Sequence, residues 1–136
     1  MKNKDKDKDT KMVIVVRGDL KNLKGEKVRS GKIVAQACHA ALGFVWANVK
    51  GKKVSFEMTD AQYDWYMSGQ TKITLKAKDE KELVEVYQRA LNAGLSAELI
   101  VDAGRTEFDG PTKTCVSIGP DYSDKIDKVT GSLSLY

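Results

Sequence analysis

Four stretches of the chain carry the hydrophobic patterns of β-strands. Residues 13–16, VIVV, are a run of β-branched side chains, which predicts a strand buried on both faces. Residues 71–77, TKITLKA, alternate polar with apolar positions, as expected of a strand with one face against a core. Residues 97–102, AELIVD, predict a further buried strand, and residues 114–120, TCVSIGP, predict a last one.

Helical patterns fall between these strands. From Gly31 to about Asn48, apolar side chains recur on one broad face, which is made by Ile33, Val34, Ala37, Cys38, Ala41, Phe44 and Val45. A capping-box signature, TDAQ at residues 59–62, predicts a short helix that ends near Gly69. Asp79 can cap a longer helix, which Gly94 ends.

The alternation of strands and helices predicts the fold class. Ser123 or Asp124 can cap a terminal helix that runs to about Val129 and completes the alternation. Such a pattern is typical of an α/β sandwich with a largely parallel sheet. The chain has 136 residues and no internal linker, so we expect residues 11–136 to form one domain.

The same pattern predicts where a site would lie. In α/β sheets, ligands bind beyond the carboxyl ends of the strands. Three polar clusters fall there: the loop and Lys32 after the first strand, residues 102–106 after the third, and the approach to Thr114. Their convergence is the main sign of a functional site.

The composition is that of a soluble globular domain and not of a membrane or secreted protein. At 41% hydrophobic and 31% charged residues, the chain is typical of a soluble globular domain. The longest apolar runs, such as MVIVV at residues 12–16, are far shorter than the roughly 20 residues of a membrane helix, so we expect no membrane partner. The Lys-Asp repeat in residues 1–10 predicts a disordered leader rather than a secretory signal.

The cysteines and the histidine indicate the compartment and the cofactors. Cys38 and Cys115 stand far apart with no CxxC spacing, so we expect two buried, reduced thiols in a cytoplasmic protein. The chain has one histidine and no clustered ligand spacing. We therefore expect no metal and no cofactor.

Positive charge is concentrated in one region. A basic cluster follows the first strand and consists of Arg17, Lys21, Lys24, Lys27, Arg29 and Lys32. A second group of cations is KGKK at residues 50–53. Clustered cations favour a polyanionic partner, but a lysine-rich solvated loop has the same pattern, and both interpretations stay open.

Lys32 follows a glycine at the start of a predicted helix, as the lysine of a nucleotide-binding P-loop does. That loop requires Gly, four residues, Gly-Lys and then Ser or Thr. Here five residues separate Gly25 from Gly31, and Ile33 follows the lysine. The pattern excludes nucleoside-triphosphate hydrolysis, although a helix N-terminus with a lysine still favours an anion.

A narrow polar and small stripe runs along this helix. Lys32, Gln36, His39 and Gly43 recur at i, i+4, i+7 and i+11, so they share one side of the helix and could line a groove. His39 could act there as a general base. A lone histidine on a mostly apolar helix is more often a packed, hydrogen-bonded core residue, so the residue pattern alone favours that structural role and leaves a functional role open.

Residues after the third strand supply candidate chemistry. Asp102 ends that strand before Ala-Gly, where a carboxylate can orient water, hold Lys32 or simply cap a turn. Arg105 suits a phosphate contact or a salt bridge. Hydroxyl groups nearby in the chain belong to Thr106, Thr112 and Thr114.

Taken together, five segments resemble one family. MVIVVRGDLK, GKIVAQACHAAL, DAGRT, TCVSIGP and IDKVTGSLSLY, in this order, are similar to the second structural class of peptidyl-tRNA hydrolases, the archaeal and eukaryotic type also found in some bacteria. The resemblance covers residues 11–136. It implies a three-layer α/β/α sandwich with a four-stranded mixed β-sheet, usually a homodimer. It also implies hydrolysis of the ester between peptide and tRNA, which frees tRNA for translation after ribosomes drop unfinished chains.

The resemblance also implies a set of site residues. The helix-start lysine, the aspartate and threonine of DAGRT, and a threonine on the next strand correspond to Lys32, Asp102, Thr106 and Thr114. We expect Asp102 to position or deprotonate water while Lys32 stabilises the oxyanion or holds the carboxylate ionised. We expect tRNA and substrate contacts from Arg17, Lys21, Lys24, Lys27, Arg29, Gln36, His39 and Arg105.

Two departures from the family concern loops. The segment between Lys21 and Gly31 is longer than the short form common in the family, and EFDGPTKT after Thr106 has Gly before Pro where Pro-Gly is frequent. Two other functions remain as alternatives. One is a non-catalytic RNA-binding or adaptor domain on the same fold, which a Lys32 far from Asp102 would favour. The other is removal of a different acyl group from RNA.

Overall fold

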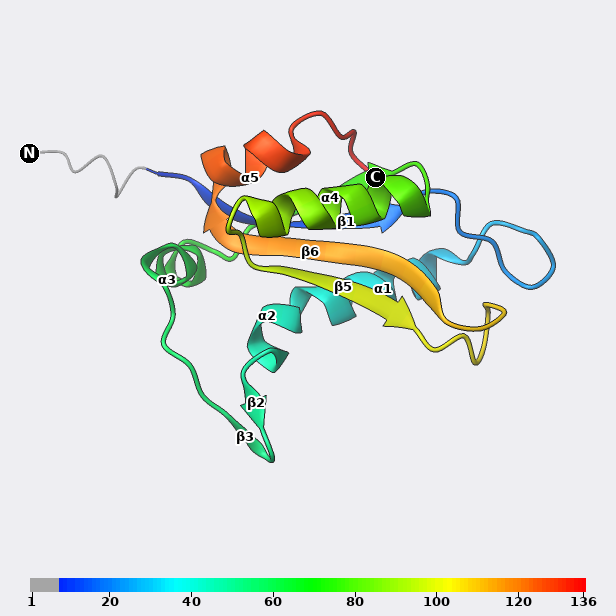
Figure 1. Cartoon of the computed structure of the whole chain (residues 1–136), viewed down its shortest axis with the longest axis horizontal. Coiled ribbons are helices and arrows are strands. Elements are labelled where there is room, and N and C mark those ends of the chain that lie inside the picture. The colour runs from blue at the N-terminus through cyan, green and yellow to red at the C-terminus, as the bar shows by residue number, and fades with distance from the viewer. Residues whose placement is uncertain (1–7) are drawn as a thin grey trace, which may run out of the picture.

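The computed structural model describes residues 8–136 and contains a four-stranded sheet in the order β4-β1-β6-β5 (Figure 1). The strands are β1 Thr10–Arg17, β4 Lys72–Ala77, β5 Ala97–Asp102 and β6 Thr112–Tyr122. β1 pairs with β4 in parallel, whereas β6 is antiparallel to both β1 and β5. The mixed sheet is therefore confirmed, and the largely parallel sheet expected from the strand-helix alternation is wrong. Loop 103–111 is too short for the crossover that parallel pairing of β5 and β6 would need.

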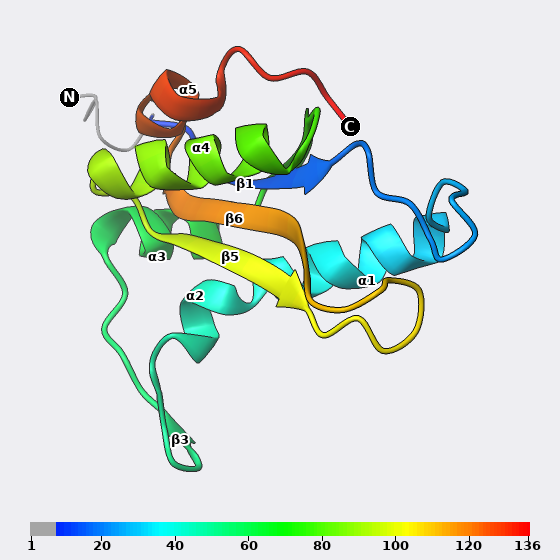
Figure 2. The ribbon, with the colours of Figure 1, turned by 45° about the vertical axis from the view of Figure 1, so that its right-hand side comes forward.

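Helices cover both faces of the sheet and give three layers (Figure 2). One face carries α4 Glu80–Asn92 and α5 Ser123–Thr130, and the other carries α1 Ser30–Ala41, α2 Gly43–Trp46 and α3 Asp60–Met67. Side chains of β1 alternate between two cores: Val13 and Val15 pack under α4 and α5, while Ile14 and Val16 pack with Ile33 of α1. This sandwich confirms the α/β/α class.

Local capping signals are reliable at two of three helices. The Thr59 side chain accepts from the backbone N–H of Gln62, and the Gln62 side chain accepts from Thr59 N–H, which confirms the capping box. Asp79 accepts from the N–H of Glu82 at the start of α4. The cap predicted at the start of α5 is wrong, because α5 has no side-chain cap and Ser123 Oγ donates to Asp9 instead.

The helix predicted from Gly31 to Asn48 is interrupted at Leu42, which separates α1 from α2. Part of its predicted apolar face is exposed, since Val34 is 61% accessible and Cys38 is also exposed. The prediction of two buried thiols is therefore wrong for Cys38 and confirmed for Cys115. The helix is rotated so that a polar residue, Gln36, takes a place in the buried face.

The polar stripe ends in Gly43 because the start of α2 packs closely against β5. A Cβ at this position would lie 2.6 Å from Cγ of Glu98 on β5. The start of α2 can thus approach the sheet edge only without a side chain. The Phe44 ring next to it packs edge-on against Phe56 and Trp65, with ring centroids 6.2 and 5.9 Å apart, and fixes the segment that leads to α3.

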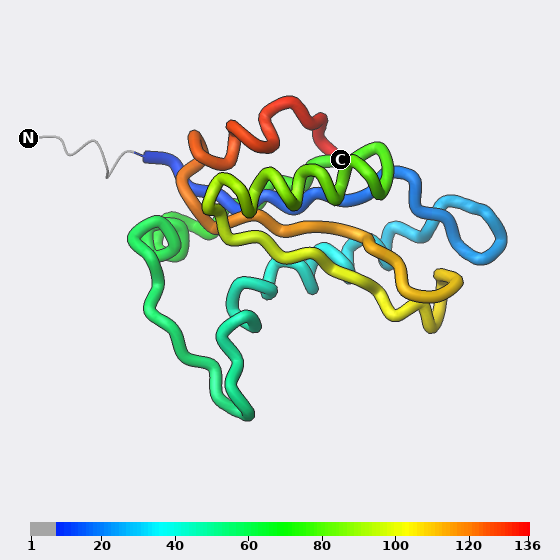
Figure 3. The backbone as a smooth tube through the Cα atoms, in the orientation of Figure 1, coloured from blue at the N-terminus to red at the C-terminus, as the bar shows by residue number. Residues whose placement is uncertain are grey.

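A small hairpin between α2 and α3 has no counterpart in the predicted elements. It consists of β2 Val49–Lys50 and β3 Lys53–Val54, and it extends away from the rest of the molecule (Figure 3). Strands of this length show too little alternation to be recognised in a sequence.

Both ends of the described chain are tied to the sheet. β1 begins at Thr10, which is buried, and the backbone N–H of Ser123 donates to Asp9, so residues 9 and 10 of the predicted leader make structured contacts. Residues 1–7 of that leader lie outside the described residues. At the other end, Tyr136 N–H donates to Thr74 O and covers part of the β4 edge. No helix in residues 8–136 has the length and apolar character needed to cross a bilayer.

Candidate active site

Chain direction brings the predicted polar clusters to one end of the sheet. β5 ends at Asp102 and β6 begins at Thr112, and the two residues are cross-strand partners. The N-terminal end of α1 lies beside this end of the sheet, with loop 103–111 extending past it (Figure 2). Residues far apart in the sequence therefore meet there.

Lys32 and Asp102 form an ion pair at this meeting point. Lys32 Nζ donates to Asp102 Oδ1 over 2.9 Å, and each side chain is 14% exposed. The carboxylate also accepts from Gln36 Nε2 at 3.2 Å and from the backbone N–H of Gly104 at 2.9 Å. The Lys32 hydrogen bond, assisted by those from Gly104 and Gln36 and opposed by partial burial, holds the pKa of Asp102 below its usual value.

Gln36 extends this ion pair into the core. Thr114 Oγ1 donates to Gln36 Oε1 over 2.6 Å, so the amide donates to Asp102 at one end and accepts from Thr114 at the other. Gln36 is 7% exposed and Thr114 is fully buried. Because both polar groups of the amide are used, its orientation is set, and Gln36 fixes Asp102 relative to the sheet.

The sequence did not predict that Gln36 bridges Asp102 and Thr114, since Gln36 was expected only among the substrate contacts. The available signal is its i+4 spacing from Lys32, which places both side chains on one flank of α1. Cys115, the next residue along β6, donates from Sγ to the Gln36 carbonyl at 3.4 Å. Burial raises the pKa of the Cys115 thiol to about 11, so it is a protonated packing group at neutral pH.

Loop 103–111 covers the ion pair. Phe108 is 5% exposed, and its ring centroid lies 5.6 Å from Lys32 Nζ, within the range of a cation–π contact. The loop is drawn tight at its base, because a Cβ on Gly104 would lie 2.0 Å from the carbonyl oxygen of Gly110. Gly104 has a φ of +78°, which also favours glycine.

Thr106 is not hydrogen-bonded to this cluster in the part of the chain that the structure describes. Thr106 and Arg105 are exposed on the loop, and within residues 8–136 neither hydrogen-bonds to Lys32 or Asp102. Thr106 instead lines a neighbouring hollow of about 310 Å³ with Arg29 and Glu107. Of the four predicted catalytic residues, Lys32, Asp102 and Thr114 are thus joined by hydrogen bonds through Gln36, and Thr106 has no hydrogen bond to them among the described residues.

His39 does not have the predicted structural role. The sequence predicts a packed core residue, but His39 is exposed on α1. The rotation of α1 that buries Gln36 and Ala40 turns His39 outward. Its ring is accessible to a ligand, and the stripe of polar residues therefore divides into a buried part and an exposed part.

The basic cluster also divides into two groups. Arg17 donates through Nε and Nη2 to Asp19 and through Nη1 to the Lys113 carbonyl, so its charge serves the fold. Arg29 pairs with Glu107. In contrast, three exposed lysines of the loop make no ion pair with any described residue: Lys21, Lys24 and Lys27.

Across residues 8–136, no group of three or more His, Cys, Asp or Glu side chains is arranged to hold a metal ion. The fold and the cluster define a class of protein, a three-layer α/β/α domain with an ammonium–carboxylate pair at one end of its sheet. Residues 10–136 match the family described as peptidyl-tRNA hydrolase PTH2. The chain belongs to this family.

Individual relatives agree with this assignment. The chain is 44% identical to a peptidyl-tRNA hydrolase of Methanopyrus kandleri, over 92% of this chain and 97% of the relative. It is 42% identical to a peptidyl-tRNA hydrolase of Methanothermobacter thermautotrophicus, over 92% and 98% of the two chains. A bovine protein named peptidyl-tRNA hydrolase 2, mitochondrial, is 41% identical over 93% of this chain and 64% of its own length.

Proposed function

We propose that this chain hydrolyses the ester between peptide and tRNA in peptidyl-tRNA, and that the Lys32–Asp102 pair is its catalytic centre. The observation that carries the proposal is the 2.9 Å contact between Lys32 Nζ and Asp102 Oδ1, held in place by Gln36 in a chain of this family. Separation of these two groups would have favoured the adaptor alternative, and their contact does not favour it.

Lys32 supplies the charge stabilisation. Its ammonium has three N–H donors, of which one is given to Asp102, so others are available to a developing oxyanion. Water adds to the ester carbonyl, and the tetrahedral intermediate then expels the 3′ oxygen of tRNA, which takes up a proton while the peptide leaves as a carboxylic acid. An ammonium beside Phe108 with little solvent around it stabilises the anionic intermediate more than bulk water would.

Asp102 acts mainly by position. A carboxylate with a lowered pKa is ionised at neutral pH and is a weak base. This supports water orientation and retention of the Lys32 charge over full proton abstraction. Thr114 is buried behind Gln36 and supports the pair indirectly as a positioning residue. Thr106, exposed on the covering loop, has the access required for a substrate contact.

The exposed cations at this end of the molecule bind the tRNA backbone. Lys21, Lys24 and Lys27 are free of ion pairs to the described residues, and Arg105 is exposed on loop 103–111. His39 is exposed in the last turn of α1 and offers a ring contact further along the helix. Arg29 pairs with Glu107, but its side chain is 70% exposed, so it contributes from beside Thr106. Arg17 is less suited to this role because Asp19 and the Lys113 carbonyl occupy its donors.

The finer features of the function are part of the same proposal. We place the protein in the cytoplasm, where it rescues tRNA from chains dropped by ribosomes, with residues 11–136 as one domain that needs no cofactor. Free thiols at Cys38 and Cys115 support a reducing compartment. Fractionation of the source cells with an antibody to the chain tests the location.

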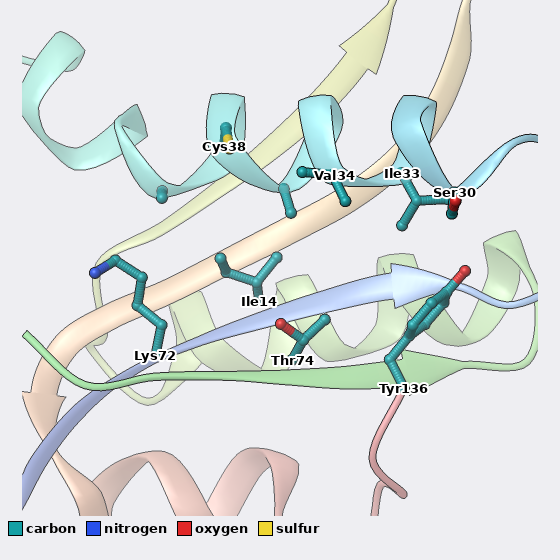
Figure 4. A pocket seen from close by; sticks show the side chains of 10 residues that line it. Ile14, Ser30, Ile33, Val34, Cys38, Lys72, Thr74 and Tyr136 are labelled. Carbon is teal, nitrogen blue, oxygen red and sulfur yellow. The ribbon is translucent and has the colours of Figure 1, made fainter.

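A homodimer is supported by an apolar hollow beside α1. Its volume is about 470 Å³, and it lies between α1 and the β1–β4 side of the sheet (Figure 4). Val34 of α1, Ile14 of β1 and Thr74 of β4 line it, and the Tyr136 ring closes one end. A second copy could cover this surface, and light scattering of the purified protein tests the stoichiometry.

Single-turnover hydrolysis of an N-blocked aminoacyl-tRNA tests the proposed chemistry. Lys32→Ala should slow the step about 10²–10³-fold, the typical effect of removing a group that stabilises an oxyanion. Asp102→Asn should also slow it, because it removes the carboxylate that orients water and holds the Lys32 ammonium in place. Lys81→Ala, an exposed change on the opposite layer, is the matched control and should keep the wild-type rate. Wild-type rates in both site variants would remove these residues from the mechanism.

A further inference from the structure

The β2–β3 hairpin projects from the molecule beyond α2 and carries a cluster of cations (Figure 1). Lys50, Lys52 and Lys53 are all exposed. In the part of the chain that the structure describes, none of them makes an ion pair or a side-chain hydrogen bond. Val49 and Val54, at the base of the hairpin, are 42% and 40% exposed, so the hairpin does not contribute to a hydrophobic core.

The two strands place like charges opposite each other. Lys50 and Lys53 are direct cross-strand partners, an arrangement that destabilises an antiparallel pair. Two-stranded hairpins are only marginally stable in water even without such repulsion. Gly51, with a φ of +61°, satisfies the first central position of the two-residue turn. A bound polyanion would offset the repulsion between Lys50 and Lys53.

The hairpin also has a hollow of suitable chemistry. Lys50 and Lys53 line it together with Asn48 and Ser55, and its volume is about 260 Å³. Ammonium, amide and hydroxyl groups are the donors with which proteins contact phosphate oxygens of nucleic acids. No acidic side chain is among the described residues that line this hollow. Its chemistry therefore fits a phosphate group.

The hairpin lies well away from Lys32, where the proposed function places the ester. α1 rises about 1.5 Å per residue, so Ala41 lies about 14 Å along the helix from Lys32, and α2 and the hairpin lie further on (Figure 2). A stacked strand advances about 3.4 Å per nucleotide, so this span corresponds to several nucleotides. With the 3′ end at Lys32, a strand that reaches the hairpin has passed beyond the nucleotide that bears the ester.

We infer that the β2–β3 hairpin is a second anchor for tRNA, which binds backbone phosphates of the base-paired stem while the Lys32 end of the molecule binds the single-stranded 3′ end. The inference rests on the proposed function, since it takes the ester to lie at Lys32. Recognition by lysines and backbone phosphates is independent of sequence, as suits an enzyme that acts on many tRNAs.

The combined variant Lys50→Ala, Lys52→Ala and Lys53→Ala tests this inference with two substrates over a range of salt concentrations. One is a full-length N-blocked aminoacyl-tRNA, and the other is a short single-stranded 3′ fragment with the same ester. On full-length tRNA, KM should rise, and its log–log dependence on salt should weaken by about 0.9 for each phosphate that the variant no longer binds. On the fragment, kcat and KM should match the wild-type values.

A matched control has the same loss of charge on the opposite layer. Lys81, Lys125 and Lys128 are exposed on α4 and α5, and changing all three to Ala should leave KM and the salt dependence on both substrates unchanged. An equal KM increase in this control would show an effect of net charge and overturn the inference. So would a wild-type KM and salt slope for the hairpin variant on full-length tRNA, or equal losses on both substrates.

Failure of the proposed function gives a different result. If the wild-type protein cleaves neither substrate, the assignment of the reaction fails, and the hairpin is then tested by filter binding of uncharged tRNA. Weaker binding by the hairpin variant than by the control still supports the anchor, and equal binding overturns it.

Discussion

Lysines in two regions of this molecule have opposite environments. Lys32, at the start of α1, is 14% exposed, bonded to Asp102 and covered by Phe108. Lys50 and Lys53, on the hairpin, are exposed and face each other without a carboxylate. The first arrangement holds one charge in a fixed place, as a transition state requires, and the second leaves charges free to follow a flexible partner.

Exposure and pairing, more than residue type, distinguish a lysine suited to catalysis from a lysine suited to binding. A partly buried ammonium needs a network to keep it in place, and Gln36 and Thr114 provide it. An exposed lysine gains little from a rigid position because water and salt screen its charge. Variants can therefore be chosen that disturb either the network around Lys32 or an exposed cation.

The largest effect after loss of the ion pair itself should follow from breaking its support. Gln36→Ala would remove the 2.6 Å acceptor of the buried Thr114 hydroxyl and leave it only the 3.5 Å contact to the Ile100 carbonyl and the 3.7 Å contact to Cys115 Sγ. Loss of a buried hydrogen bond of this kind typically costs about 1–3 kcal/mol of unfolding free energy. The unsupported Asp102 would also shift relative to Lys32, so kcat should fall. Urea unfolding and single-turnover kinetics measure the two effects.

Thr114→Val is the matched comparison, because it removes the same hydrogen bond with little change of shape. Gln36 keeps its bond to Asp102 in this variant, so the loss of kcat should be smaller than in Gln36→Ala. Unchanged kinetics in both variants would mean that the network serves stability alone.

The stability that the ionised Asp102 carboxylate contributes should depend on pH. Its folded pKa lies below the ordinary value of about 3.9, so the ionised carboxylate contributes stability that is complete above that value. This contribution should disappear as the pH falls through the lowered folded pKa. The difference in unfolding free energy between wild type and Asp102→Asn, measured from pH 7 downward, should be constant at first and shrink only in that acidic window. A difference that already shrinks near pH 6 would contradict the lowered pKa.

Local signals and long-range contacts differ in how far the sequence can predict them. The caps at Thr59 and Asp79 depend on residues three positions away, and both predictions are confirmed. Strand locations also follow from short patterns. The hydrophobic pattern does not give the direction of β6, because a buried strand has the same pattern in parallel and antiparallel sheets. The short connection from β5 does give it, since it leaves no room for a parallel crossover.

In the candidate site, too, some features follow from local sequence patterns and others depend on long-range contacts. Lys32 and Asp102 can be expected near each other because strand ends and a helix start meet at one end of an α/β sheet. The bridging role of Gln36 depends on the rotation of α1 against β6, which helical spacing alone leaves undetermined. The exposure of His39 follows from the same rotation, and the pairing of Arg17 with Asp19 depends on a side-chain conformation.

The smallest expected effect compares a free cation with a paired one in the loop region. Lys24→Ala should leave kcat unchanged and weaken the salt dependence of KM by about 0.7 if it contacts a single-stranded phosphate. Arg17→Ala should instead lower the unfolding free energy, since it removes the bonds to Asp19 and the Lys113 carbonyl, and should leave the salt dependence as in wild type. Salt titrations of KM and urea unfolding of the two variants separate these effects. If Arg17→Ala weakens the salt dependence as strongly as Lys24→Ala does, then tRNA competes with Asp19 for the guanidinium, and pairing in the free protein does not mark a cation as structural.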